Sequence, residues 1–359
     1  MRAVKSVAVA LAAVALAAVA VLASGGPAAR AASTYTPAIT VADGNSVIAV
    51  QTSGNGLRFY WNEHGTNTWH GEQVAADGTT FSSPSIAQVG NSVVIAAQGA
   101  GNSLDFYWQP NGGSGWTPEA VAGPLTTYDA PSVTPDGNAA IIAAEGPGNS
   151  LDFYWAASVS SAWHQETVAG PGTTFSSPSQ TMNGNSVNIA AEGPRNSLDF
   201  YWAANGTSTW TREVVAGPGT TVSPPAITAN DGSVNVVAHR GIWQGMEFYW
   251  AVNGTTTWHA ERLPGTSEGT PAITTDAGGV NVVASTLFGG LGVAATSNGT
   301  GTWQWAQVAP NSAGLFNPAV TMNDGIENIA AFDAGGNLDF YWDDGGYYVP
   351  EVVDTSANL

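Results

Sequence analysis

The sequence predicts an all-β fold, a seven-bladed β-propeller with four antiparallel strands in each blade. A short phrase, Ser-Leu-Asp-Phe-Tyr-Trp, recurs along the chain either letter for letter or in weaker copies. The copies end at Trp61, Trp108, Trp155, Trp202, Trp250 and Trp342. The first five of these tryptophans are 47, 47, 47 and 48 residues apart. A repeat of this length is typical of solenoids, propellers and arrays.

A series of prolines gives an independent count of the repeat. Each of these prolines opens the same short apolar run: Pro37, Pro84, Pro131, Pro178, Pro225, Pro271 and Pro318. One further copy of the aromatic phrase, at 290–295, has lost its aromatic residues. Its last residue, Ala295, still falls 45 residues after Trp250 and 47 before Trp342. Both series therefore give seven units, and we expect blades to begin near residues 37, 84, 131, 178, 225, 271 and 318.

The third unit shows the four strands that we expect in each blade. A short strand at 131–134 is followed by the turn signal Asp-Gly-Asn and by an apolar strand at 139–144. After a Gly-Pro-Gly-Asn turn, residues 151–155 have strong β propensity, and a last strand covers 163–168. Short strands separated by Gly, Pro and Asn predict an antiparallel meander. We refer to these strands as a, b, c and d in chain order.

Strand c predicts that both faces of each sheet are covered. Leu151, Phe153 and Trp155 alternate with Asp152 and Tyr154, so large side chains lie on both faces. This pattern suits a blade packed between two neighbours. A solenoid is the alternative, but it would need capping segments at its ends, and few residues flank the seven units. The sequence does not predict how the ring closes, because no strand is clearly shared between the two ends.

The N-terminal residues predict secretion. Arg2 and Lys5 precede an apolar stretch at 6–23, and small residues lead to a cleavage site of the form Ala29-Arg30-Ala31. We therefore expect a signal peptide at 1–31 and the propeller at 32–359, with an extracellular location. An uncleaved membrane anchor is the alternative. The chain has no cysteine, which excludes a disulfide framework.

The charge excludes several classes of partner. The formal net charge is −19, and removal of Arg2, Lys5 and Arg30 with the signal peptide takes it to −22. Such a surface repels phosphate backbones, so we expect no nucleic-acid partner and no anionic membrane partner. Acidity also keeps a secreted protein soluble. An oligomer remains possible.

One face of the ring gathers the candidate binding residues. In a meander with strand a at the axis, the b–c hairpins and the d–a connections emerge on the same face, which we call the Gly-Pro face. An aromatic plate, a carboxylate or amide and an asparagine could together bind a sugar. Alternatively, the aromatics wedge between blades and the asparagines serve turns. The candidates are Phe81, Tyr128, Phe175, Gln98, Glu145, Glu192, Asn102, Asn149, Asn196, Arg195, His239 and Trp243.

The tryptophans of strands c and d and the glutamate of strand d are interpreted mainly as structural. Trp155 and Trp163 flank one hairpin, and we expect them to meet across it as part of the core. The strand-d glutamate recurs in six units, with Glu166 in the third. It could bind ligand in a cleft between blades, but we expect a hydrogen bond to the backbone of a neighbouring blade.

The repeat resembles a known family. The pattern G-x-x-N-S-L-D-F-Y-W, followed by W-x-x-E-x-V-A-G-P-G-T-T-[FY]-S-x-P-S, is similar to secreted bacterial seven-bladed propeller lectins, which include the fucose-binding lectins of insect-associated bacteria. The resemblance covers the whole chain after the signal peptide. It implies several sugar sites arranged around the ring, between blades. The candidate residues given above come from the geometry of the ring and not from the resemblance.

These observations predict a secreted, multivalent lectin that binds neutral sugars of glycans or glycoconjugates. A propeller glycoside hydrolase is one alternative, because two carboxylates suffice for that reaction. However, Glu145 and Glu192 occupy equivalent places in their repeats, which suits repeated binding, and no G-x-S-x-G nucleophile motif is present. A non-catalytic protein-interaction scaffold is the other alternative. No histidine spacing suggests a metal site, so we expect neither a metal nor a cofactor.

Overall fold

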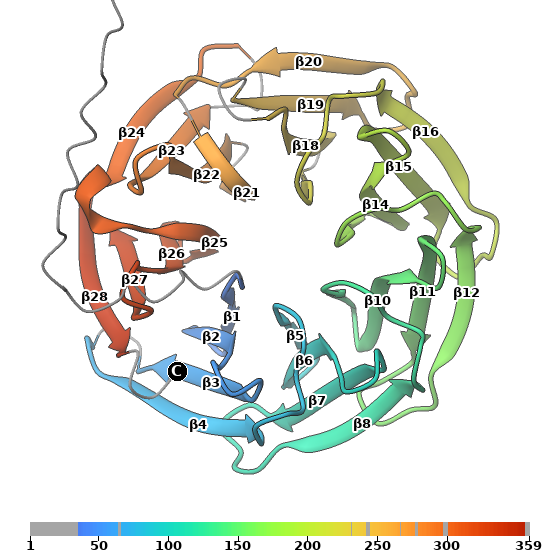
Figure 1. Ribbon diagram of the computed structural model, residues 1–359, viewed down its shortest axis with the longest axis horizontal. Helices are drawn as coiled ribbons and strands as arrows, with labels where there is room; N and C mark the ends of the chain where they lie inside the picture. The colour runs from blue at the N-terminus through green and yellow to red at the C-terminus, as the bar shows by residue number, and fades with distance from the viewer. Residues whose placement is uncertain are drawn as a thin grey trace, which may run out of the picture.

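The prediction of a seven-bladed β-propeller is confirmed. The computed structural model describes residues 35–63, 66–230, 232–241, 245–265, 267–276, 279–296 and 301–355. Seven four-stranded antiparallel sheets are arranged in a ring, with strand a innermost and strand d outermost (Figure 1). The predicted signal peptide lies outside the described residues.

The strands follow one another without crossovers inside each blade. Blade 1 contains β1 (Ala38–Ala42), β2 (Asn45–Gln51), β3 (Leu57–Asn62) and β4 (Trp69–Ala75). Blade 2 contains β5 (Ser85–Val89), β6 (Ser92–Gln98), β7 (Leu104–Pro110) and β8 (Thr117–Ala122). Blade 3 contains β9 (Ser132–Asp136), β10 (Ala139–Gly146), β11 (Ser150–Ala156) and β12 (His164–Ala169). Blade 4 contains β13 (Ser179–Asn183), β14 (Ser186–Gly193), β15 (Ser197–Ala204) and β16 (Thr211–Ala216).

The remaining three blades have the same order. Blade 5 contains β17 (Ala226–Ala229), β18 (Ser233–His239), β19 (Met246–Val252) and β20 (Trp258–Arg262). Blade 6 contains β21 (Ser267–Asp276), β22 (Gly279–Thr286), β23 (Leu291–Thr296) and β24 (Gln304–Ala309). Blade 7 contains β25 (Phe316–Asn323), β26 (Ile326–Phe332), β27 (Leu338–Asp343) and β28 (Tyr348–Asp354), and a single 3-10 turn, η2 (Asn311–Ala313), precedes it. In the described part of the chain, no helix has the length and apolar character that crossing a membrane requires.

The hydrophobic core is divided among the interfaces between blades. Seven clusters of buried apolar residues occur, and each combines side chains from two adjacent blades. Between blades 3 and 4, Leu151 and Phe153 of β11 pack against Tyr201 of β15, whereas Tyr154 packs on the other side against blade 2. The predicted two-faced pattern of strand c is therefore confirmed. Burial on both faces explains why strand c is apolar on one side and keeps an aromatic ring on the other.

An edge-to-face aromatic pair recurs at six of the interfaces. The strand-c phenylalanine of one blade meets the strand-d tryptophan of the next, as in Phe106 with Trp163, whose ring centroids are 5.0 Å apart at 71°. Such pairs contribute roughly 0.5–1.5 kcal/mol beyond the area that they bury. The equivalent pairs are Phe59–Trp116, Phe153–Trp210, Phe200–Trp258, Phe248–Trp303 and Phe340–Trp69.

The ring closes through side chains between blades 7 and 1. Each sheet in the described residues is built from four consecutive strands, so the two ends of the chain share no sheet. Instead, the Trp69 indole donates to Glu351 at 2.9 Å, and the Tyr60 hydroxyl donates to Asp354 at 2.8 Å. Asn328 adds a buried contact, donating to the Ser46 hydroxyl at 2.8 Å. The seam is therefore an ordinary inter-blade interface without a chain connection.

Candidate functional site

The Gly-Pro face brings together the predicted aromatic and polar residues of each unit. The backbone N–H of Tyr128 donates to the carbonyl of Glu145 at 3.0 Å. The backbone N–H groups of Phe81 and Phe175 donate in the same way to the carbonyls of Gln98 and Glu192. These three aromatic side chains remain 41–45% exposed. They form a row of partly exposed aromatic side chains along blades 2, 3 and 4, as expected for either a binding surface or a set of wedges.

The polar candidates form pairs four residues apart within the b–c hairpins. Asn149 donates to Glu145 at 2.7 Å, and Asn196 makes the same bond to Glu192 at 2.5 Å. Gln98 donates instead, to the Asn102 side chain at 3.1 Å and also to the carbonyl of Thr127 in the next connection at 2.8 Å. Asn102, Asn149 and Asn196 adopt left-handed φ angles of 61–64°, which asparagine tolerates. These polar side chains therefore have a role in the turns.

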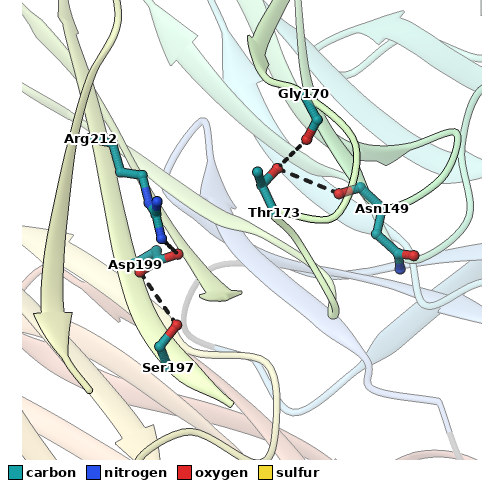
Figure 2. Close-up of polar contacts among 6 residues, drawn as sticks. All are labelled: Asn149, Gly170, Thr173, Ser197, Asp199 and Arg212. Atoms are coloured by element: carbon teal, nitrogen blue, oxygen red, sulfur yellow. Dashed lines mark hydrogen bonds and ion pairs between the residues drawn. The ribbon is translucent and has the colours of Figure 1, made fainter. Parts of the chain in front are cut away.

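The same hairpins are tied to the following d–a connection. Figure 2 shows Thr173 donating from its hydroxyl to the carbonyl of Gly170 at 2.6 Å and to that of Asn149 at 3.4 Å. In blade 5, His239 takes the place of Gln98 and lies with its Nε2 2.8 Å from the carbonyl of Ser267, as Gln98 bonds to the carbonyl of Thr127. Arg195 lies exposed at the tip of its hairpin, and Trp243 lies outside the described residues. The binding role of all these residues stays a prediction.

Glu145 and Glu192 of this face have raised pKa values. Burial raises the pKa of Glu145 to about 7, and the nearby charge of Asp129 adds to the effect. Burial also raises the pKa of Glu192, although the hydrogen bond from Asn196 opposes it. In blade 4 a further buried carboxylate, Asp199, is paired with a cation and not with an asparagine: Figure 2 shows its 2.8 Å ion pair with Arg212. Burial still raises the pKa of Asp199, while this arginine opposes the rise.

Cavities between blades open on the opposite face, where the a–b turns and c–d loops meet. We name each cleft after its two blades. Cleft 3/4 has a volume of about 440 Å³, cleft 4/5 about 360 Å³, cleft 7/1 about 310 Å³ and cleft 1/2 about 210 Å³. In cleft 3/4, Trp155 and Glu166 of blade 3 face Trp210 and Asn205 of blade 4. Across its rim, Asn205 donates to Asp136 at 2.7 Å.

A carboxylate held by indole N–H groups lies at each of six interfaces. In cleft 4/5, Glu213 accepts from Trp202 and from Trp258, both at 2.9 Å. The strand-d glutamate thus bonds to side chains and not to a neighbouring backbone, so the expectation of a backbone partner was wrong. The strand-d glutamates with a tryptophan donor from the next blade are Glu72, Glu119, Glu166, Glu213, Glu261 and Glu351.

The expected contact of Trp155 with Trp163 was also wrong. Trp155 pairs with His164 in the β11–β12 register, so the two share one face of the sheet. Trp163 precedes His164 and packs on the other face, against Phe106 of blade 2. The two tryptophans of one hairpin therefore belong to different interfaces, because neighbouring residues of a strand point in opposite directions.

The interface between blades 6 and 7 lacks this arrangement. Ala295 occupies the strand-c tryptophan position, since it pairs with Gln304 as Trp155 pairs with His164. By the same register, Ala306 stands where the other blades have glutamate. Trp305 does not replace them, because it pairs with Ala294 and lies on the other face of blade 6, toward blade 5. This interface therefore lacks both the tryptophan and the glutamate that line the other clefts.

The clefts combine the groups that a neutral sugar requires. Half-buried tryptophan rings provide apolar plates, a carboxylate provides hydrogen-bond acceptors, and asparagines lie at the rim. Aromatic rings accept the C–H face of a pyranose, while a few placed polar groups fix its orientation. Among the described residues, no group of three or more His, Asp or Glu could hold a metal ion. From the sequence these residues were interpreted mainly as core, although their recurrence in six units is the signal that could have marked a site.

Comparisons with solved structures agree with the architecture. The BP39L lectin of Burkholderia pseudomallei is 17% identical with a TM-score of 0.78, over 88% of this chain and 99% of that one. The Aleuria aurantia lectin in complex with Fucα1-6GlcNAc is 13% identical with a TM-score of 0.54, over 90% and 96%. A prolyl endopeptidase is 12% identical with a TM-score of 0.55, over 90% of this chain and 50% of that one.

At sequence identities of 12–17%, these matches show that the folds are similar and show nothing about function. The match to a peptidase shows that this architecture also occurs in proteins with other functions. No protein-family model and no curated protein sequence matches the chain. The chain is therefore a seven-bladed β-propeller with the architecture of known propeller lectins.

Proposed function

We propose that this protein is a secreted, multivalent lectin that binds neutral sugars in the clefts between its blades. The observation that supports it most is the recurrence of one arrangement, a glutamate between two tryptophans, at six interfaces of the same ring. A catalytic centre needs its groups once, whereas clefts of one repeated design suit repeated binding. The lectin structures with a similar fold contain α-methyl-L-fucoside or Fucα1-6GlcNAc, which makes fucosides suitable first probes.

Charge restricts the sugars that the clefts accept. The chain carries a formal charge of −19, and each cleft places a carboxylate next to the ligand. Acidic sugars would therefore be repelled, so the proposal specifies neutral ones. A monosaccharide buries little area and binds weakly, but several clefts on one rigid ring bind a glycan-coated surface more tightly through effective concentration.

A glycan array followed by calorimetry tests this proposal. We expect binding to neutral glycans and a stoichiometry above one per chain. Trp155→Ala removes one wall of cleft 3/4, so it should abolish that site and leave the others, lowering the stoichiometry by about one. A single site, or no binding to any glycan, would refute the proposal.

Tyr128→Ala provides the matched variant on the Gly-Pro face. Its side chain is 41% exposed and is not part of the lining of cleft 3/4. If sugars bind in the clefts, this variant should bind with the stoichiometry of the unmodified protein. If instead it loses sites while Trp155→Ala does not, the sugars bind at the predicted residues of the Gly-Pro face.

A further inference from the structure

The residue opposite the strand-c tryptophan divides the clefts into two groups. In blades 1, 3 and 5 it is a histidine, and in blades 2, 4 and 7 it is threonine or valine. The pairs with histidine are Trp61–His70, Trp155–His164 and Trp250–His259. The other pairs are Trp108–Thr117, Trp202–Thr211 and Trp342–Val349.

The opposite residue correlates with the position of the indole. Trp155 and Trp250 stack on their histidines with ring centroids 4.1 Å apart at 19°, and Trp61 stacks on His70 at 5.4 Å and 25°. None of these three indoles donates to a residue that the structure describes. Where threonine or valine lies opposite, the indole donates to the strand-d glutamate of its own blade at 2.9 Å. The three bonds are Trp108–Glu119, Trp202–Glu213 and Trp342–Glu351.

The difference changes what each glutamate can offer to a ligand. In cleft 4/5, both oxygens of Glu213 accept an indole N–H, from Trp202 on Oε1 and from Trp258 on Oε2. In cleft 3/4, Glu166 accepts only from Trp210, on Oε2 at 3.4 Å, and its Oε1 has no donor among the described residues.

We propose that His164 makes cleft 3/4 a sugar site by holding Trp155 flat against its ring and away from Glu166. Trp155 then presents its other face to the cleft, and the free Oε1 of Glu166 accepts a sugar hydroxyl. The cleft with threonine opposite its tryptophan, cleft 4/5, is occluded by its own indole. His70 and His259 act in the same way, so binding clefts alternate with occluded ones. This inference rests on the proposed lectin function and specifies which clefts perform it.

The cost of displacing an indole supports this division. A sugar hydroxyl that bonds to Glu213 must share an oxygen with the N–H of Trp202 or Trp258, or displace that N–H. Because a hydrogen bond to a charged group is among the stronger ones in a protein, the occluded clefts should bind the same sugar roughly one to two orders of magnitude more weakly. A titration at moderate sugar concentration therefore counts only the clefts with histidine.

Exchange of the two residue types between neighbouring blades tests the inference. The probe is methyl α-L-fucoside, or the methyl glycoside of the tightest sugar on the array if no fucoside binds. The wild-type protein should titrate with about three sites per chain, one for each stacked histidine. His164→Thr should lower the number by about one, and Thr211→His should raise it by about one. His164→Phe retains a ring for stacking and should keep the wild-type number.

Crystal structures without sugar give a readout that does not depend on binding. In His164→Thr, the Trp155 indole should turn and donate to Glu166; in Thr211→His, Trp202 should leave Glu213 and stack on the new imidazole. Both substitutions introduce a residue that an equivalent position already holds, so the fold should tolerate them. Unchanged indoles, or six equal sites in the wild-type titration, would overturn the inference. Indoles that move as expected without binding of any glycan would overturn the proposed function instead.

Discussion

Trp69→Ala should destabilise the protein more than Trp258→Ala, although the two tryptophans make the same contacts. Trp69 meets Phe340 at 4.9 Å and donates to Glu351 at 2.9 Å, and Trp258 meets Phe200 at 5.0 Å and donates to Glu213 at 2.9 Å. Loss of a large, half-buried aromatic ring costs about 3 kcal/mol at either place. The two sites differ in their position along the chain.

The additional effect arises because the seam has no covalent connection. Blades 4 and 5 are joined by a short connection, which keeps them close when their interface weakens. Blades 7 and 1 are the ends of the ring, and the entropic cost of bringing chain segments together grows with the length between them. We therefore expect Trp69→Ala to open the ring locally at β1–β4 and β25–β28.

Denaturant unfolding and amide hydrogen exchange measure the two variants. Trp69→Ala should show a lower midpoint than Trp258→Ala and an early loss of protection in the first and last blades. Trp258→Ala should lose protection mainly through global unfolding. Equal midpoints and equal exchange patterns would mean that the ring is cooperative throughout, and that the seam is no weaker than any other interface.

The sequence predicted the fold because the repeat reports the same information seven times. The alternation in Leu151, Phe153 and Trp155 against Asp152 and Tyr154 predicted two covered faces, and both faces are packed against neighbours. A pattern within one strand is enough for this inference, because neighbouring side chains must point to opposite sides.

The register between strands could not be predicted in the same way. Whether Trp155 faces Trp163 or His164 depends on a shift of one residue, which moves every side chain to the other face. The c–d loop varies in sequence among the units, so the repeat alone did not fix that shift. Pairing Trp155 with Trp163 assigned both tryptophans to one core. The cleft that Trp155 and Glu166 line together with Trp210 of the next blade was therefore not predicted.

The Gly-Pro face illustrates the opposite case. Its aromatics and polar residues were correctly placed together, because connections at one end of a meander must share a face. What each side chain does there was not predictable, since Glu145 and Gln98 make hairpin bonds that any turn could use. Position on a shared face therefore does not separate a binding residue from a residue that stabilises a turn.

The stability of the protein should fall as the pH rises through 7, and Glu327 should account for much of the change. This side chain lies in β26 with 3% exposure and accepts a hydrogen bond from Tyr348. Burial raises its pKa from 4.5 to about 7, and the charges of Asp343 and Asp276 add to the rise. Burial also raises the pKa values of Glu145 and Asp339 to about 7, so they act in the same direction.

The sign follows from the two states of the carboxyl group. The folded protein binds the proton of Glu327 more tightly than the unfolded chain, so this contribution is complete below pH 4.5 and is lost as the pH rises through 7. At about 1.4 kcal/mol per pKa unit, the group contributes roughly 3 kcal/mol across this window. Glu327→Gln removes the titration and retains an oxygen that can accept from Tyr348.

The variant should therefore change how the free energy of unfolding depends on pH, and not only raise or lower it equally at every pH. Denaturant unfolding of Glu327→Gln is expected to give a stability close to that of the wild type at pH 5 and a higher stability at pH 8, by roughly 2 kcal/mol. Asp324→Asn, at the exposed β25–β26 turn, changes the net charge by the same amount and serves as the control. If both variants raise the stability equally at pH 8, the effect comes from general charge repulsion. If neither does, the buried carboxyl group of Glu327 is ionised in the folded protein without a cost, and the surrounding polar groups stabilise its charge.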